Sequence, residues 1–200
     1  MNCFGLMDTF ESEMFKELTC DHAQLSDLTF RSCTFKHCNF TETVFHYCRF
    51  LDCEFEECDL SMIKVPDCAF NARFKVCKLL GVDWTVAVWG KQGLLNALHF
   101  EQCTVNYSTF IGLALPKFTL RGCIARDVDF MEADLHNADF TDTDFDESRF
   151  HETNLTGADF SGATNYRIDA RINRISKAKF QLPEALTLLH SLDVELSEAR

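Results

Sequence analysis

Large apolar residues recur at every fifth position along most of the chain. Between Phe10 and Phe70 this position is always apolar, and it is apolar again throughout the run from Phe100 to Phe160. Two residues before it, the chain often carries a small residue such as Cys, Ala or Thr. A repeat of fixed length decides a fold before local propensities do, so the period has to be explained first.

A period of five fits neither regular element. Five residues of an α-helix advance by about 500°, which spreads the apolar residues around the helix, and an odd step along a strand places them on opposite faces. The pattern is satisfied if the chain turns a corner once per repeat. The small and the apolar residue then point to one side of a short extended segment, and the next two residues form the corner. The sequence therefore predicts an all-β solenoid whose core exists only because its coils stack.

The register is disturbed between the two runs. Phe74 follows Phe70 by four residues, and Phe100 follows Trp89 by eleven. The segment between Trp89 and Phe100 contains two glycines, which favour turns. One interpretation is an accommodation of drift between two half-arrays. The other is a projecting recognition loop, because loops on rigid scaffolds often carry function. The candidate loop comprises Gly90, Lys91, Gln92, Gly93, Leu94, Leu95 and Asn96.

The end of the chain has a different pattern, which predicts a short helix. Pro183 suits the first helical turn, and leucines at helical spacing form an apolar stripe. The stripe could cap the last coil or join two copies about a two-fold axis, which makes it the candidate dimer interface. We divide the chain into a lead-in at 1–9, an array at 10–180 that is irregular near 71–99, and a helix and tail at 181–200. The stripe contains Leu182, Leu186, Leu189 and Leu192.

The 11 Cys residues raise the question of a metal or disulfide framework. Nine of them occupy the small position, and apart from Cys77 their intervals are multiples of five, whereas metal ligands favour pairs two to four residues apart. A free Cys packs as a small hydrophobe, so we expect thiols, no metal and no cofactor. Residues 20 apart, such as Cys33 and Cys53, should stack at about 4.8 Å, but a reducing cytosol keeps them as thiols.

The formal net charge of −12 argues against binding to nucleic-acid phosphate or to an anionic membrane surface. Residues 126–165 carry −9, from 2 basic and 11 acidic residues. The bland interpretation is a solvated face. The alternative is an array of negative charge on a rod, which a DNA-binding surface could accept. The candidate partner-binding acidic face contains Asp129, Asp134, Asp139, Asp142, Asp144, Asp146, Glu147 and Asp159.

No catalytic motif stands out in the sequence. It contains no Gly-x-Ser-x-Gly elbow, phosphate-binding loop or His pair at metal-ligand spacing. The chain begins without a basic leader segment and contains no apolar run of membrane-spanning length. We therefore expect a cytoplasmic protein that is not an enzyme and binds another protein.

The repeat resembles a known family. Its pattern is clearest in Ala133-Asp134-Leu135-His136-Asn137-Ala138-Asp139-Phe140, which looks like the pentapeptide-repeat family. The resemblance implies a right-handed quadrilateral β-helix with four pentapeptides per coil, which the short C-terminal helix predicted above would follow.

Three further stretches resemble the topoisomerase-protecting branch of that family, which comprises Qnr-, AlbG- and McbG-like proteins. They are Gly81 to Trp89, the Asp-rich second run, and the tail from Asn165 to Leu196. The resemblance implies a dimeric rod, joined through its C-terminal ends, that binds DNA gyrase, with topoisomerase IV as a second candidate. It would relieve poisoning by quinolones, albicidin or microcin through DNA mimicry and projecting loops. The alternative is a generic pentapeptide-repeat scaffold unrelated to topoisomerase.

Overall fold

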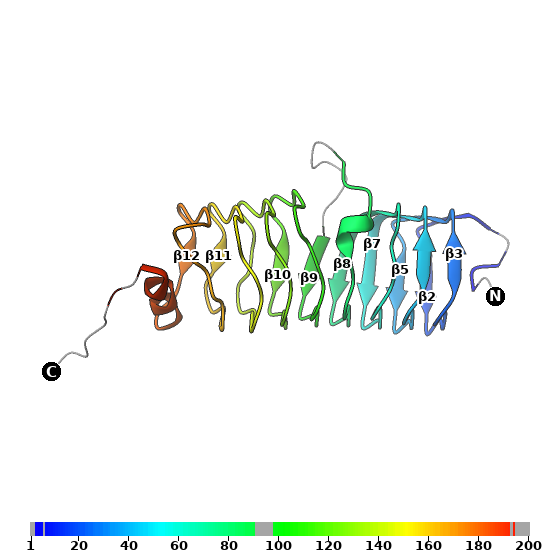
Figure 1. Ribbon diagram of the computed structural model, residues 1–200. Coiled ribbons are helices and arrows are strands. Elements are labelled where there is room, and N and C mark those ends of the chain that lie inside the picture. Colours follow the sequence, from blue (N-terminus) through cyan, green and yellow to red (C-terminus); the bar gives the residue numbers. More distant parts are fainter. Residues whose placement is uncertain (1–2, 6, 91–97, 193, 195–200) are drawn as a thin grey trace.

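The computed structural model describes residues 3–5, 7–90, 98–192 and 194. The chain forms a rod of stacked coils, with its two ends at opposite ends of the rod (Figure 1). All pairings between its strands are parallel, which confirms the predicted β-solenoid. The strands are β1 (Thr9–Glu11), β2 (Met14–Lys16), β3 (Gln24–Ser26), β4 (Thr29–Arg31), β5 (Thr34–Lys36), β6 (Val44–His46), β7 (Arg49–Glu56), β8 (Ala69–Lys75), β9 (Leu98–Glu101), β10 (Thr119–Arg121), β11 (Asp159–Phe160) and β12 (Lys179–Phe180). The 3-10 helices are η1 (Trp84–Val86) and η2 (Glu184–Leu192).

Each coil is aligned on the next with the same residue register. Phe10 pairs with Phe30 and Phe30 with Phe50, so four repeats of five residues complete one coil. The backbone hydrogen bonds run between coils; for example, the N–H of Thr29 donates to the carbonyl oxygen of Asp8 at 2.7 Å. A single repeat therefore satisfies few of its own backbone groups, and stacking supplies the rest.

The corners use a backbone conformation that most residues avoid. The residue two places after the buried apolar residue has a positive φ, with values of 54° at Ser12, 53° at Glu17 and 53° at His22. This left-handed conformation is unfavourable for a residue with a Cβ. The corner N–H groups offset that cost by bonding to the next coil, as the N–H of Ser12 does to the carbonyl oxygen of Arg31 at 2.8 Å.

The core consists of stacked rings and buried thiols. Phe35 and Phe55 stack with ring centroids 4.6 Å apart and planes 10° apart. The Sγ of Cys58 accepts the backbone N–H of Cys38 at 3.4 Å, and its thiol donates to the carbonyl oxygen of Glu56, also at 3.4 Å. Burial raises the pKa of the Cys53 thiol to about 12, so it stays protonated at neutral pH.

The expected thiols are present at all nine cysteines of the small position, which are free and buried. The expectation was wrong for the other two, because a disulfide joins Cys3 to Cys20. Cys20 occupies an apolar position of the first coil, and Cys3 belongs to the lead-in. Next to it, the ring of Phe4 contacts the rings of Phe10 and Phe30 at 5.6 and 5.0 Å. The lead-in thus covers the open N-terminal end of the ring column.

The missing residue between the two runs removes one corner. β7 and β8 pair as long continuous strands, with a register shift between Leu51 and Cys53. Phe74 nevertheless pairs with Phe55, so the stacking register is restored one repeat later. Trp84 is fully buried and stacks on Phe110 at an interplanar angle of 13°. Of the candidate loop, residues 91–96 lie outside the described residues, and its role stays a prediction.

The C-terminal helix differs from the expected amphipathic α-helix. η2 is a 3-10 helix, which has three residues per turn. Leu186, Leu189 and Leu192 therefore lie along one line of the helix, and Leu188 packs against the core of the rod. Leu182, the first residue of the predicted stripe, precedes η2 and is exposed, and the role of the stripe in a dimer stays a prediction.

We expect Phe140→Ala to lower the free energy of unfolding by about 3–5 kcal/mol, because it removes a fully buried ring from the column. Phe140→Leu retains most of the volume and should cost less than about 1.5 kcal/mol. Urea denaturation measures both. Equal losses for the two variants would contradict the assignment of Phe140 to a close-packed column.

Candidate protein-interaction surface

The rod has four sides, which we number from the first coil. Phe10 lies on the first side, Phe15 on the second, Cys20 on the third and Leu25 on the fourth. We call the residue before the buried apolar residue the side residue, and the positive-φ residue two places after it the corner residue. Side residues, corner residues and the residue between the buried apolar residue and the corner residue point outward, and a partner could touch the rod at these positions.

The eight predicted acidic residues do not share one face. Consecutive repeats occupy consecutive sides, so a run of acidic side residues winds around the rod. The coil-to-coil pairings fix their positions: Thr119 with Asp139, Ile124 with Asp144, Thr109 with Asp129 and Ala114 with Asp134. Asp134 lies on the first side, Asp139 and Asp159 on the second, Asp144 on the third and Asp129 on the fourth. Asp142 and Glu147 are corner residues, and Asp146 lies between Phe145 and the corner residue Glu147.

The acidic side residues have a structural task at the corners. Asp139 Oδ1 accepts the backbone N–H of Thr141 at 3.1 Å and its hydroxyl at 2.7 Å. Asn39 makes the same pair of bonds to Thr41, at 2.9 and 2.7 Å, without any charge. An Asx side chain at this position therefore orders the turn that follows it. Folding alone accounts for the period-five carboxylates that the sequence displays most clearly.

Several of these carboxylates are also neutralised locally. Asp129 is only 5% exposed and pairs with Arg149 from the next coil. The interpretation of this residue as solvated was wrong, because its carboxylate lies beneath that guanidinium. Asp159 pairs with Lys179 at 2.8 Å, and Asp144 with Arg126 at 2.8 Å. Such paired charges stabilise the stacked coils and contribute little negative potential at the surface.

The pKa directions agree with this arrangement. Burial alone would raise the pKa of Asp144, but hydrogen bonds from Asn165 and Arg126 outweigh it and lower the pKa below its usual range. Burial also opposes ionisation of Asp159, and Lys179 and Ser161 again bring the pKa down. Lowered folded-state values stabilise the fold above the unfolded-state pKa, near 3.9. That stabilisation is lost as the pH falls below this value.

Five acidic residues between 126 and 165 remain exposed, and four of them stand at the two corners bordering the fourth side; the fifth, Asp142, stands at the corner between the second and third sides. Asp127 and Glu147 occupy the corner between the third and fourth sides, with φ values of 52° and 56°. Glu132 and Glu152 occupy the corner between the fourth and first sides, with φ values of 59° and 55°. We call these four residues the acidic ridges.

The predicted site contains only one member of the acidic ridges, Glu147. The pattern did not single out Asp127, Glu132 and Glu152, because most of the predicted residues precede an apolar position and these three follow one. The signal that identifies them is the place two residues after the apolar position, where the corner turns the side chain outward.

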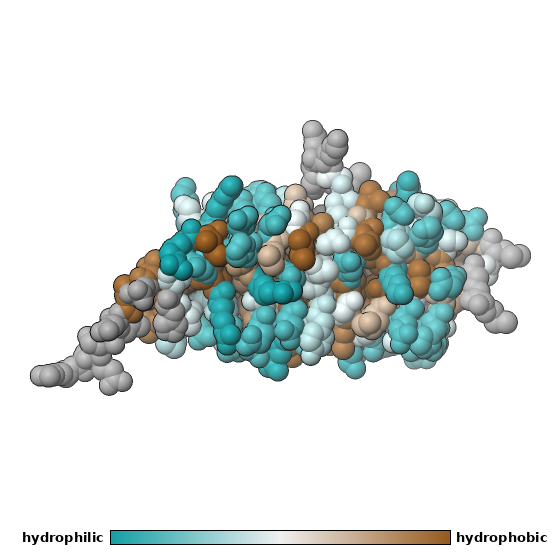
Figure 2. All heavy atoms as spheres, in the orientation of Figure 1, coloured by the Kyte–Doolittle hydropathy of each residue, from teal (hydrophilic) through white to brown (hydrophobic). Residues whose placement is uncertain are grey.

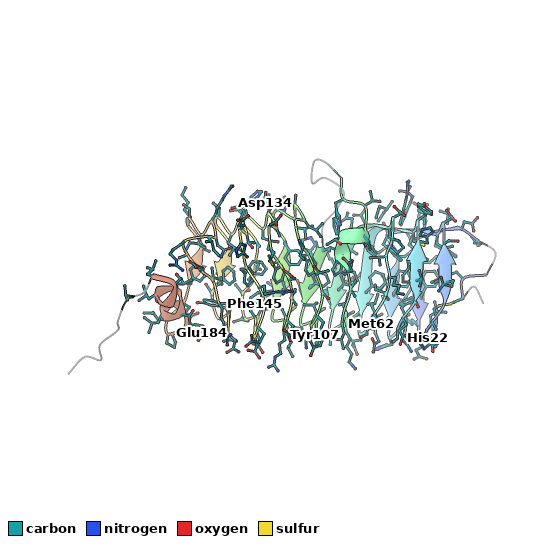
Figure 3. All side chains as sticks on the ribbon, viewed as in Figure 1. His22, Met62, Tyr107, Asp134, Phe145 and Glu184 are labelled. Carbon is teal, nitrogen blue, oxygen red and sulfur yellow. A yellow bond between two sulfur atoms is a disulfide. The ribbon has the colours of Figure 1, made fainter. Side chains whose placement is uncertain are left out.

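The side between the acidic ridges is hollowed. A depression of about 360 Å³ is lined in part by Met131, Arg149 and His151. In Figure 3, His22, Met62 and Tyr107 follow one edge of the rod, which is the corner that continues into Asp127 and Glu147. Figure 2 shows hydrophilic side chains over most of the visible face, with separate apolar patches between them. The acidic ridges therefore belong to the C-terminal half of a mixed surface.

Within the described ranges, no three His, Cys, Asp or Glu side chains converge closely enough to hold a metal ion. None of the helices in those ranges combines the length and the apolar composition needed to cross a membrane.

Comparisons with known proteins identify the repeat. The family model described as "Pentapeptide repeat region" matches residues 28–110, and the one described as "Pentapeptide repeats (8 copies)" matches 119–151 and 129–164. No curated protein matches the chain in sequence.

Solved structures share the fold at low sequence identity. A trypsin-treated variant of QnrB1, a plasmid-mediated fluoroquinolone resistance protein, is 20% identical, with a TM-score of 0.62 over 94% of this chain and 90% of its own. Full-length QnrB1 is 18% identical, with a TM-score of 0.57 over 93% of this chain and 100% of its own.

The acidic side residues should differ measurably from acidic residues without a structural bond. Asp144→Ala removes the acceptor for Asn165 and Arg126 and should lower the free energy of unfolding by about 1–2 kcal/mol. Asp146→Ala changes a neighbouring carboxylate, and we expect a change within about ±0.5 kcal/mol. Chemical denaturation at neutral pH compares them, and equal effects would refute the structural role of Asp144.

Proposed function

The chain belongs to the pentapeptide-repeat family, and from that premise we propose that it binds DNA gyrase and protects the enzyme from an inhibitor such as a quinolone. The observation that carries the proposal is the pair of acidic ridges on this β-solenoid, which shares its fold with a fluoroquinolone resistance protein. A second candidate function is that of a scaffold for a partner unrelated to topoisomerase. The family membership alone supports both.

Charge geometry supports recognition by a surface that normally holds DNA. The two acidic ridges run parallel to the rod axis on coils spaced about 4.8 Å apart. Where both ridges are occupied, they supply a negative charge roughly every 2.4 Å of axis, against one per about 1.7 Å in duplex DNA. The ridges flank one side of the rod, as the two phosphate strands flank a groove. A basic DNA-binding surface would therefore meet two pairs of carboxylates, one pair on each border of the fourth side.

Protection in this proposal requires that the rod occupies the DNA-binding surface of gyrase, and it requires no catalysis. A rod held where DNA or the drug-bound DNA complex would lie competes with the poisoned state by mass action. The lines of negative charge mainly raise the association rate and select the partner's basic surface. The protein would act in the cytoplasm, where gyrase meets DNA.

We further propose that two copies join through the C-terminal ends. On η2, Leu186 is 43% exposed and Leu192 is 47% exposed, although both are apolar. These residues share a line with Leu189, whereas Leu188 already faces the core. A two-fold contact along this line would bury the exposed leucines and double the length of the rod.

The first test neutralises the acidic ridges with Asp127→Asn, Glu132→Gln, Glu147→Gln and Glu152→Gln. We expect gyrase binding to weaken roughly tenfold or more, with parallel loss of rescued supercoiling in the presence of a quinolone. A matched control changes four exposed corner residues of the N-terminal half: Glu17→Gln, Asp27→Asn, Glu42→Gln and Glu57→Gln. Since the net charge changes equally, the control should retain most binding.

Three outcomes would count against this assignment. Equal weakening by both sets would show that net charge matters and the acidic ridges do not. Loss of rescue on deleting residues 90–96, with the ridge variant still active, would favour recognition through the candidate loop. Absence of both gyrase binding and rescue by the unmodified protein would leave the scaffold function.

The proposed dimer is tested with Leu189→Asp, which places a charge in the apolar contact. Sedimentation at micromolar concentration should show a dimer for the unmodified protein and a monomer for the variant. Leu182→Asp is the control, because this exposed residue lies before η2 and should leave the dimer intact. A monomeric unmodified protein would mean that η2 serves only as a cap.

A further inference from the structure

A second candidate site lies at the C-terminal end of the rod, separate from the acidic ridges. A cavity of about 540 Å³ opens between the corner at Asp146, the segment 165–169 and one face of η2. Glu184, Thr187 and Ser191 line it from the helix. A cavity of this volume falls within the range of small-molecule sites, about 300–1,000 Å³.

The charged groups around this cavity leave an excess of negative charge. Arg167, which lines it, is paired with Glu147 at 3.1 Å, and Asp169 is paired with Arg171 at 2.8 Å. Asp146 and Glu184 have no ion-pair partner among the described residues. Glu184 Oε1 accepts the backbone N–H of Asn165 at 2.7 Å, which holds the carboxylate at the cavity wall. Two carboxylates across one cavity favour a cation.

Tyr166 provides a second and independent observation. Tyr166 belongs to the cavity wall, its side chain is fully buried behind that wall, and among the described residues its hydroxyl has no hydrogen-bond partner. A buried polar group without a partner is unfavourable and calls for a physical explanation. Burial, and secondly the charge of Glu184, raise the pKa of Tyr166 to about 12, so the hydroxyl stays protonated near that carboxylate. A protonated hydroxyl still has lone pairs that accept a hydrogen bond.

We propose that this cavity binds an organic cation, an ammonium or guanidinium group on a short apolar stem. The cation would donate hydrogen bonds to Glu184 and Asp146 and, after a small adjustment of the wall, to the Tyr166 hydroxyl. A bare metal ion fits less well, because the described carboxylates do not converge on a single point. This site does not depend on gyrase binding.

The same chemistry has two sources, a free small cation or an Arg or Lys side chain of a protein partner. The probes are n-butylguanidinium for the first source and the blocked tripeptide Gly-Arg-Gly for the second, each titrated into the full-length protein and followed by NMR amide shifts. N-butylurea is the neutral control, with similar shape and no charge. We expect saturable binding of at least one cationic probe with a Kd of about 1 mM or below, and none of N-butylurea.

Three variants locate the binding. Glu184→Gln keeps the acceptor for Asn165 but removes the charge, and should weaken binding about tenfold. Tyr166→Phe should weaken binding and also raise the Tm of the unliganded protein, because the unsatisfied hydroxyl is gone. A residue with only a structural role would not produce this pair of effects. Glu152→Gln, on an acidic ridge, should leave the affinity unchanged.

Saturable binding of butylguanidinium supports a free cation as the ligand, and binding of the tripeptide alone supports a partner's side chain. The proposal is overturned if neither cation binds at about 10 mM, or if N-butylurea binds equally well. It is also overturned if Glu184→Gln and Tyr166→Phe retain full affinity.

Discussion

The whole structure depends on the residue-for-residue alignment of each coil on the next. A repeat of five residues cannot satisfy its own backbone groups, so they form hydrogen bonds to the residues one coil away. These bonds make the ladder, hold the corners, and align the rings into columns. This constraint explains where irregularity is tolerated. The missing residue before Phe74 straightens one corner, and the pairing with Phe55 is recovered at once. It also explains the left-handed corners, which persist because each bonds to its neighbour.

The sequence pattern predicts most of the fold because, in a solenoid, the position of a residue within the repeat determines whether its side chain is buried. It predicts less of the surface, because exposure depends on residues one coil away. Asp129 and Asp139 occupy equivalent repeat positions, yet only Asp129 lies beneath an arginine, Arg149. The ends escape the pattern for a different reason. No further coil covers them, and local devices such as the Cys3 disulfide and η2 take over.

Acidic residues have two different roles in this structure, which the net charge alone does not distinguish. Carboxylates at the side positions order the turns and pair with cations of neighbouring coils, so they contribute to folding wherever they occur. Carboxylates at the corners do not order the turns, and their side chains stay exposed even where they pair with a neighbouring coil, as Glu147 does with Arg167. The four acidic ridge residues are of the second kind, and they gather on both borders of one side. Function is therefore better inferred from the corner positions than from the net charge of −12.

The most direct test of this account is carboxylate footprinting of the protein with and without gyrase, using carbodiimide labelling and mass spectrometry. In the free protein, the acidic ridge residues should be labelled readily and the buried Asp129 hardly at all. Binding of gyrase should protect Asp127, Glu132, Glu147 and Glu152, while Glu17 at the far end stays reactive. Unchanged labelling of the ridges in a gyrase-saturated sample, or protection confined to the N-terminal half, would contradict the account.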